Sequence, residues 1–188
     1  TYLGKLYSTQ LRDPRLLFGA LQQLIQAKQI DTQAVRVRFH TDPKGMRDIH
    51  ELGKHYQITD ILDINGYVPR QDILSLMHSS SILLVVTTLS TPNGTNSIIG
   101  TKFFENIGVE KPILCVRSDE DCLADAIEKT HAGIAATNVE EVKAFILEKY
   151  NEWRQNGFTR QAVINKEQFT RQHEAEQFEQ LFIKTLKH

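Results

Sequence analysis

Short apolar runs alternate with stretches of helical periodicity along this chain. Residues 35–39 alternate apolar and polar side chains, which predicts a half-buried strand near a sheet edge. Residues 82–86 are continuously apolar, which is typical of a central parallel strand covered on both faces. Residues 16–25 carry an apolar stripe with helical spacing between two strand-like runs. Strands that alternate with helices in this way predict βαβ units and a parallel sheet.

The same pattern gives an ordered set of elements. Strands are expected at residues 2–6, 35–39, 61–64, 82–86, 112–116 and 133–136. Asp13-Pro14 is expected to start the first helix, with Asp as the cap and Pro at the first helical position. Asn138 begins an Asn-x-x-Glu capping box. We predict an α/β fold with a Rossmann-like open parallel sheet of about six strands and helices on both faces.

Length and composition define the class of protein. The 188 residues suffice for one α/β domain, and we treat 1–188 as a single domain whose terminal helix, from about residue 159, packs partly on it. The formal net charge of −1, without a long run of like charge, argues against nucleic acid as the main partner. No apolar stretch has the length of a membrane span, and no signal peptide is evident. Because the chain begins at Thr1 without a methionine, we interpret it as a piece of a longer protein.

The reactive side chains give little sign of metal or redox chemistry. Cys115 lies inside an apolar run and is expected to be a buried thiol. Cys122 is the other cysteine, and two cysteines without a disulfide framework fit a reducing cytoplasm. The seven histidines show no metal-ligand spacing. We therefore predict no metal, no other cofactor and a cytoplasmic location.

The loop after the strand at 82–86 is the best candidate for ligand chemistry. It runs into a helix, and its glycine and hydroxyl residues can offer backbone N–H groups and hydroxyls to a phosphate. Lys102 would add a positive charge there, and Glu105, one turn later, can accept bonds from ribose hydroxyls. Spacing alone also fits, and favours, a polar surface loop in which both side chains are simply exposed. The candidates that this loop contributes are Gly94, Thr95, Ser97, Thr101, Lys102 and Glu105.

Four segments together resemble a known family. Residues 100–114 resemble the K-x-x-E-Y-x-x-x-x-K-P-I signature in the C-terminal, donor-nucleotide-binding domain of family 4 and related GT-B glycosyltransferases. Residues 65–77 resemble the family's F-x-G-x-V-P segment, and residues 80–86 fall where it has an A-D-x-x-L-x-x-S strand. Residues 2–17 resemble its G-x-L-Y…R-D-P-x-x-L-L opening. The four occur in family order.

The resemblance implies roles for single residues. Glu105 would hold the donor ribose, and Lys102, with the glycine- and threonine-rich loop, would approach the diphosphate. Lys5 and Arg12 match opening-loop cations that neutralise the departing diphosphate. Tyr67 and Val68 would lie near the base. Without the resemblance, each of these residues has a simpler interpretation. Lys5 fits a surface lysine at a strand end, and Arg12 fits a residue that flanks the helix start. Tyr67 fits an aromatic residue that packs on the domain.

One position departs from the family pattern. Many members have a second glutamate eight residues before the ribose-binding one, and Ser97 stands there in this chain. In the family this carboxylate helps to handle the donor sugar. Its absence leaves the donor sugar and the stereochemical course open, so no retaining mechanism is inferred.

The resemblance implies a function for the longer protein. It would transfer a sugar from a UDP- or GDP-sugar to a glycan or lipid-linked acceptor in polysaccharide biosynthesis, with charged side chains in place of a metal. Its N-terminal acceptor domain would lie outside this chain, and the full-length enzyme would associate peripherally with a membrane. Alone, this chain would bind the donor weakly and catalyse little.

Two alternatives belong to other classes. A sugar-nucleotide epimerase shares the GT-B architecture, but it needs acid and base groups that converge from two domains. A flavodoxin-like interaction domain without enzymatic activity is the third candidate. The polar residues 8–10 count against a receiver-type domain, which wants an acidic cluster after its first strand.

Overall fold

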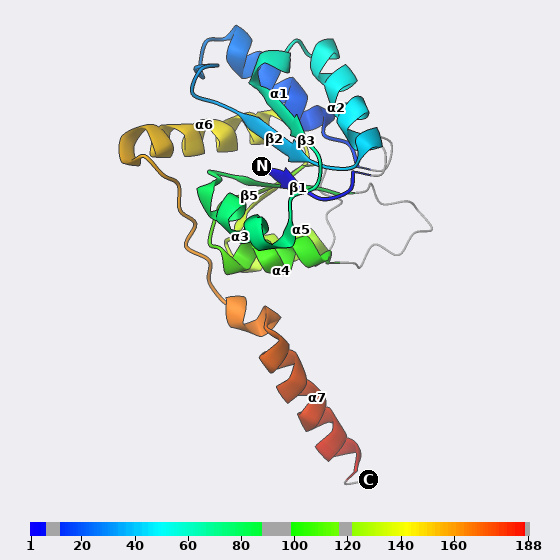
Figure 1. The fold of residues 1–188 in the computed structure, drawn as a ribbon. Coiled ribbons are helices and arrows are strands. Elements are labelled where there is room, and N and C mark those ends of the chain that lie inside the picture. Colours follow the sequence, from blue (N-terminus) through cyan, green and yellow to red (C-terminus); the bar gives the residue numbers. More distant parts are fainter. Residues whose placement is uncertain (7–11, 88–98, 117–121, 187–188) are drawn as a thin grey trace.

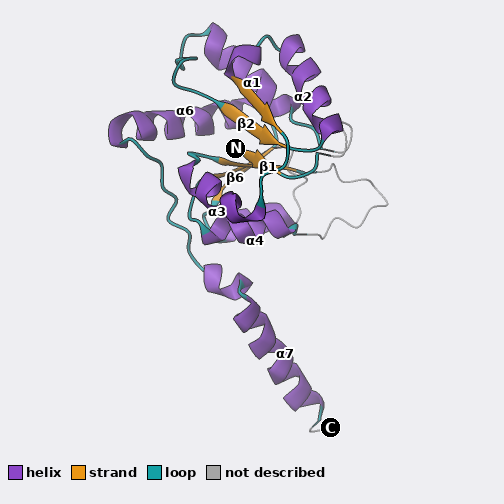
Figure 2. Cartoon of the chain, viewed as in Figure 1, coloured by secondary structure: helices purple, strands orange, loops and turns teal. Residues whose placement is uncertain are grey.

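The computed structural model describes residues 1–6, 12–87, 99–116 and 122–186. Its elements follow the predicted order, strands alternating with helices (Figures 1 and 2). The strands are β1 (Tyr2–Leu3), β2 (Val37–His40), β3 (Leu62–Asn65), β4 (Leu83–Val86), β5 (Ile113–Val116) and β6 (Gly133–Ala136). The helices are α1 (Arg15–Gln26), α2 (Pro43–His55), η1 (Thr59–Ile61), α3 (Arg70–Ser79), α4 (Thr101–Gly108), α5 (Cys122–Lys129), α6 (Val139–Asn156), η2 (Lys166–Phe169) and α7 (Arg171–Thr185).

The strands form two parallel three-stranded sheets, β1-β2-β3 and β4-β5-β6. Thr1 joins them: its amine donates to the Ile82 carbonyl at 2.8 Å, and its own carbonyl accepts from the Leu84 amide at 2.8 Å. The strand succession is thus 3-2-1-4-5-6, an order of doubly wound nucleotide-binding folds, with the switch point between β1 and β4. The predicted α/β class is confirmed, although two small sheets replace the single predicted sheet because β1 is only two residues long.

Helices cover both faces of β4 and β5. Helices α1, α2 and α6 lie on one side, and α3, α4 and α5 lie on the other (Figure 1). Leu84 packs in the core that α1 and α6 build, whereas its neighbour Val85 packs in the core under α4 and α5. The strand is therefore apolar at every position, as residues 82–86 predicted. Cys115 lies on the α4 and α5 side of β5 and is buried, which confirms its interpretation as a buried thiol.

The strand predicted near a sheet edge, β2, lies next to the edge strand β3 and is not itself the edge. Phe39 pairs with Tyr2 of β1 on one side and with Ile64 of β3 on the other, so β2 is the middle strand of its sheet. Its alternating pattern matches the different surroundings of successive side chains. Phe39 is buried against Tyr2, while Arg38 forms an ion pair with Asp63 on the neighbouring strand at 3.4 Å.

The two predicted helix caps differ in outcome. Asn138 caps α6, since its side chain accepts from the Glu141 amide at 3.0 Å; the Glu141 carboxylate in turn accepts from the Thr137 amide at 2.8 Å. At α1, Pro14 is the N-cap instead of the first helical residue. Asp13 still serves the helix start, because its carboxylate accepts from the Arg15 amide at 2.9 Å.

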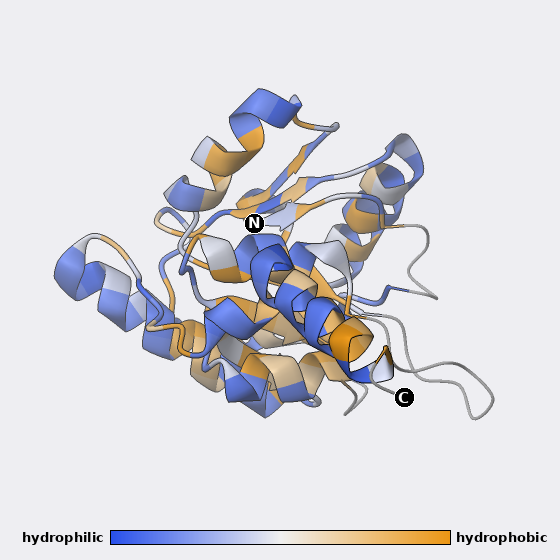
Figure 3. Ribbon diagram, turned by 90° about the horizontal axis from the view of Figure 1, so that it is seen from below, coloured by the Kyte–Doolittle hydropathy of each residue, from blue (hydrophilic) through white to orange (hydrophobic). Residues whose placement is uncertain are grey.

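The tail follows the prediction only in part. η2 packs on the body through Phe169, whose ring centroid lies 5.3 Å from that of Phe103. Helix α7 instead extends away from the body (Figure 1), and apolar and polar positions alternate along it (Figure 3). Its large apolar side chains are exposed. These exposed residues are Phe178, Leu181, Phe182, Ile183 and, just beyond the helix, Leu186. Within the described ranges, no helix combines the length and the apolar character that crossing a bilayer requires.

Candidate functional site

A lysine and a tyrosine from distant parts of the chain meet at the switch point. β1 ends at Leu3, and α4 begins at Thr101 beyond the carboxyl end of β4. There the Lys102 Nζ atom lies 4.7 Å from the centroid of the Tyr2 ring and donates to the Tyr2 hydroxyl at 3.4 Å. Such a crevice, beyond the carboxyl ends of strands that diverge, is where open parallel sheets bind ligands.

Gly4 makes room for this contact. Its φ angle is +123°, a backbone conformation that residues with a Cβ rarely adopt. A Cβ at this position would come within 2.6 Å of Lys102 Cε and 2.7 Å of Nζ. The backbone of Gly4 is held in place because its amide donates to the His40 carbonyl at 2.9 Å. A glycine directly after β1 therefore lets Lys102 lie against the strand.

The Tyr2 hydroxyl also organises the opening segment. It donates to the Lys5 carbonyl at 2.9 Å, and Arg12 Nη1 donates to that carbonyl at 2.7 Å and to the hydroxyl oxygen at 3.4 Å. Tyr2 itself is fully buried, while the Lys5 side chain is exposed. Two of the predicted cations, Arg12 and Lys102, thus converge on one buried hydroxyl.

The loop after β2 supports the same segment. The Leu6 amide donates to Thr41 Oγ1 at 3.1 Å and lies 3.3 Å from Asp42 Oδ1. Thr41 is fully buried, and Asp42 is the N-cap of α2. Burial works to raise the pKa of Asp42, but hydrogen bonds from Leu6, Thr41 and Gly45 outweigh it, so the pKa of this carboxyl lies below its usual range. Asp42 therefore stays ionised and anchors the opening segment.

The electrostatics of Lys102 reflect its position. Burial, followed by the nearby charge of Arg12, lowers the pKa of Lys102 to about 8, and Glu105 opposes this change. Burial raises the pKa of Tyr2. The hydrogen bond from Arg12 and the charge of Arg12 oppose this rise, whereas Asp42 and Tyr67 add to it. The hydroxyl is therefore a neutral partner for the two cations at neutral pH.

The other predicted site residues lie around this centre. Glu105 is exposed on α4 and lines a small hollow together with Lys102. Thr101 is exposed at the start of α4. Tyr67 is 61% exposed, and Val68 is half-buried, both in the segment between β3 and α3. The predicted Gly94, Thr95 and Ser97 lie outside the described residues.

Sequence reasoning did not single out Tyr2 and Gly4 as site residues, nor Thr41 and Asp42. The available signal was local: a glycine between a two-residue apolar strand and Lys5, and an Asp-Pro helix start after β2. Neither signal reveals a partner one hundred residues away. The contact between Tyr2 and Lys102 arises from the order of the strands.

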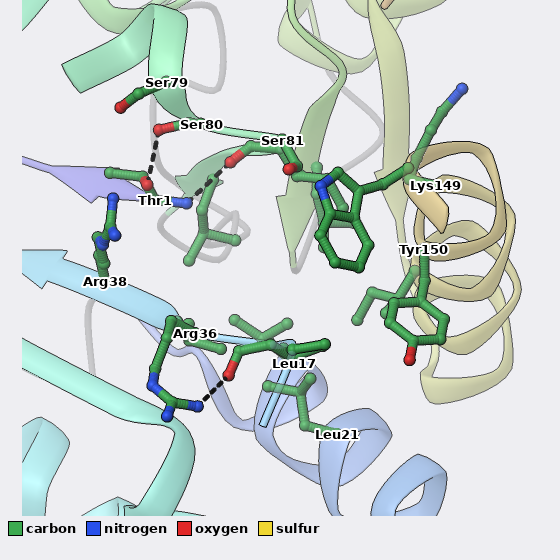
Figure 4. Close-up of a pocket in the computed structure, with 18 residues that line it drawn as sticks. Thr1, Leu17, Leu21, Arg36, Arg38, Ser79, Ser80, Ser81, Lys149 and Tyr150 are labelled. Atoms are coloured by element: carbon green, nitrogen blue, oxygen red, sulfur yellow. Dashed lines mark hydrogen bonds between the residues drawn. The ribbon is translucent and has the colours of Figure 1, made fainter. Parts of the chain in front are cut away.

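A separate cavity of about 370 Å³ lies at the opposite edge of the sheets (Figure 4). It opens at the amino ends of β2 and β4, beside Arg36 and Ser80, and the Trp153 and Tyr150 rings of α6 wall it. The hollow beside Lys102 is much smaller, at about 10 Å³. The Lys102 crevice is nonetheless the candidate ligand site, because it lies at the carboxyl ends of the strands and gathers two cations, Arg12 and Lys102.

Two solved structures share this fold. The G117R mutant of S. aureus TarM, solved in complex with fondaparinux, alpha-GlcNAc-glycerol and UDP, matches with a TM-score of 0.55 and 14% identity over 80% of this chain. WaaG, a glycosyltransferase involved in lipopolysaccharide biosynthesis, matches with a TM-score of 0.53 and 14% identity over 80% of this chain. The chain has the fold of a GT-B glycosyltransferase domain.

The chain matches only a part of each of these two structures. It spans 28% of the TarM chain and 38% of the WaaG chain. No protein-family model matches the sequence, and no curated protein does. At 14% identity the two neighbours establish the fold, and the site itself must be argued from the residues of this chain.

Proposed function

We propose that this chain is the donor-binding half of a glycosyltransferase and that it holds the diphosphate of a UDP- or GDP-sugar in the crevice between β1 and β4. One observation carries the proposal: Arg12 and Lys102, ninety positions apart in the chain, both donate to the Tyr2 hydroxyl at the switch point. Two cations at the carboxyl edge of such a sheet match the charge of a diphosphate.

The start of α4 adds to this positive site. Gly100, its N-cap, has no side chain that could cap the first turn, so this helix start can offer backbone N–H groups to an anion. Together with Lys102 and Arg12, the helix would stabilise the negative charge that develops on the diphosphate as the sugar leaves. In the proposal this neutralisation takes the place of a metal.

Glu105 is proposed to bind the ribose. It lies one turn after Lys102 on α4, is exposed and lines the same hollow. Its two carboxylate oxygens can accept bonds from neighbouring hydroxyls of a ribose. Tyr67 and Val68 are proposed to approach the base, since they follow the carboxyl end of β3 and Tyr67 is largely exposed there.

The acceptor is proposed to bind to another part of the protein. Because this chain spans 28% and 38% of its two structural neighbours, groups that hold the acceptor or remove its proton are expected in an N-terminal domain of the same protein. TarM was solved with UDP, and WaaG is involved in lipopolysaccharide biosynthesis. These two neighbours favour UDP as the first nucleotide to test and a glycan or lipid-linked acceptor.

Calorimetric titration with UDP, GDP, ADP and UDP-sugars tests the proposal. We expect saturable binding of UDP or GDP, weakened about tenfold in Glu105→Ala through loss of the ribose contacts. The matched control is Glu128→Ala, which removes an exposed glutamate from α5 and should bind like the wild type. No binding of any nucleotide at millimolar concentration, in this chain and in a longer form of the protein, would contradict the proposal.

A further inference from the structure

The Lys102 side chain lies in an unusual place for a lysine on a surface helix. Its ammonium group contacts both the ring and the hydroxyl of Tyr2, and the end of its stem passes Gly4. Lysines usually keep the charged group in water and bury only the stem. Here the charged end itself is drawn against β1, so Lys102 is half-buried.

The groups around Lys102 come from several elements. Among the described residues they are Arg12 from the opening segment, Glu105 on α4 and Tyr2 on β1. The hollow is also lined by Thr1, Leu3 of β1, Met77 of α3, and Leu83 and Leu84 of β4. Arg12 and Lys102 share one acceptor oxygen, so their positive charges approach each other in a partly dry environment.

We propose that Tyr2 is a positioning residue that holds Lys102 at the diphosphate end of the crevice, and that Lys102 takes up a proton as the diphosphate binds. The inference rests on the proposed donor site. A diphosphate beside Lys102 favours the ammonium form and offsets the repulsion from Arg12. The proton comes from the buffer and forms a new N–H bond at Nζ.

The pKa of Lys102 determines how the affinity for the diphosphate changes with pH. Burial and Arg12 lower this pKa to about 8, so the ligand-free lysine is partly neutral above that pH. An anion that favours the charged form must then bind together with a proton, and its affinity falls as the pH rises further. Well below pH 8 the lysine is already charged, and binding needs no proton.

Calorimetry in two buffers of different ionisation enthalpy measures this proton. UDP binding to the wild-type chain at about pH 8.5 should take up a fraction of a proton, and the uptake should vanish near about pH 7. Lys102→Arg is the matched control: its charge is permanent, so it should bind UDP without proton uptake. Equal uptake by the wild type and Lys102→Arg would overturn the inference.

The part played by Tyr2 can be measured without a ligand. Tyr2→Phe keeps the ring but removes the oxygen that accepts from the ammonium, so the titration midpoint of Lys102, followed by side-chain NMR, should move to lower pH. The control is Tyr150→Phe, which loses a hydroxyl that accepts from the Asp31 amide and should leave the midpoint unchanged. An unchanged midpoint in Tyr2→Phe would overturn the positioning role.

The two experiments separate this inference from the proposed function. UDP binding without proton uptake would overturn the inference and leave the donor site standing. A shifted Lys102 midpoint in Tyr2→Phe, together with no nucleotide binding, would overturn the donor site and the proton uptake, and would retain only the structural contact.

Discussion

Arg12 Nη1 donates to the carbonyl oxygen of Lys5 at 2.7 Å, which ties the chain just before α1 to the chain just after β1. Arg12 therefore does two things: it brings a positive charge to the crevice, and it fixes the backbone that carries the Lys5 side chain. The Lys5 side chain is exposed, whereas its main-chain carbonyl accepts from Arg12.

This arrangement predicts different results for the two cations. Arg12→Ala should weaken nucleotide binding and also lower the free energy of unfolding by about 1 kcal/mol, because a charged hydrogen bond to Lys5 is lost. Lys5→Ala should weaken binding and leave stability within about 0.5 kcal/mol of the wild type. Chemical denaturation beside calorimetry checks both. A larger stability loss in Lys5→Ala than in Arg12→Ala would contradict the division of roles.

Glu105 should discriminate between nucleotides with and without ribose hydroxyls. If its carboxylate accepts from ribose hydroxyls, the wild type should prefer UDP over 2′,3′-dideoxy-UDP by about tenfold, since two charge-assisted bonds are missing in the analogue. Glu105→Ala should bind both ligands equally weakly. Competition titrations measure the ratio. A preference retained in Glu105→Ala would show that other groups bind the ribose.

Lys102 should make stability depend on pH in a defined window. Its folded pKa of about 8 lies below the ordinary value of 10.5, so the cost of burying its charge is fully present below about pH 8 and disappears as the pH approaches 10.5. Relative to Lys102→Met, the wild type should gain stability across this window. Urea denaturation at a series of pH values measures the difference, and a difference that is constant with pH would contradict the lowered pKa.

Much of the fold could be predicted from local patterns. The apolar run at 82–86, the Asn138 capping box and the order of the elements all follow from neighbours in sequence, and the structure confirms them. The partners of β2 on its two sides, β1 and β3, could not be predicted this way. One consequence of this pairing is the ion pair between Arg38 and Asp63 of β3, the next strand along the chain.

The site was less accessible to such reasoning than the fold. Lys102 and Glu105 were recognisable through the resemblance of residues 100–114 to a family signature, since their spacing alone favours a polar surface loop. Tyr2 appeared only as a strand residue, because its role comes from Lys102, one hundred positions away. The junction of the two sheets at Thr1 also depends on a distant pairing, with Ile82 and Leu84.

Gly133 should tolerate no side chain. A Cβ there would lie 1.9 Å from the carbonyl oxygen of Ile113, the residue with which it pairs on β5. Gly133→Ala should therefore destabilise the domain by several kcal/mol, on the order of 3 or more, through loss of β6 pairing. The matched control is Gly108→Ala at the end of α4, where a Cβ meets nothing within 4 Å; it should be neutral or slightly stabilising. Thermal unfolding compares the two, and equal melting temperatures would contradict the packing of β6.

The C-terminal helix should be dispensable for the stability of the body. A chain that ends after Thr170 loses α7, whose large apolar residues are exposed, and should unfold within about 0.5 kcal/mol of the full chain. Phe169→Ala should cost more, about 1–2 kcal/mol, because this ring packs on Phe103 and Phe104. A large loss on removal of α7 would show that the helix packs on the body in solution.

The most direct test of the donor site is a map of backbone amide shifts during UDP titration. The account predicts saturable changes centred on residues 2–5 and 101–105, and their loss in a variant that carries both Lys102→Met and Arg12→Ala. Changes centred instead on Arg36, Ser80 and Trp153 would place the nucleotide in the cavity at the opposite edge of the sheets and contradict the assignment.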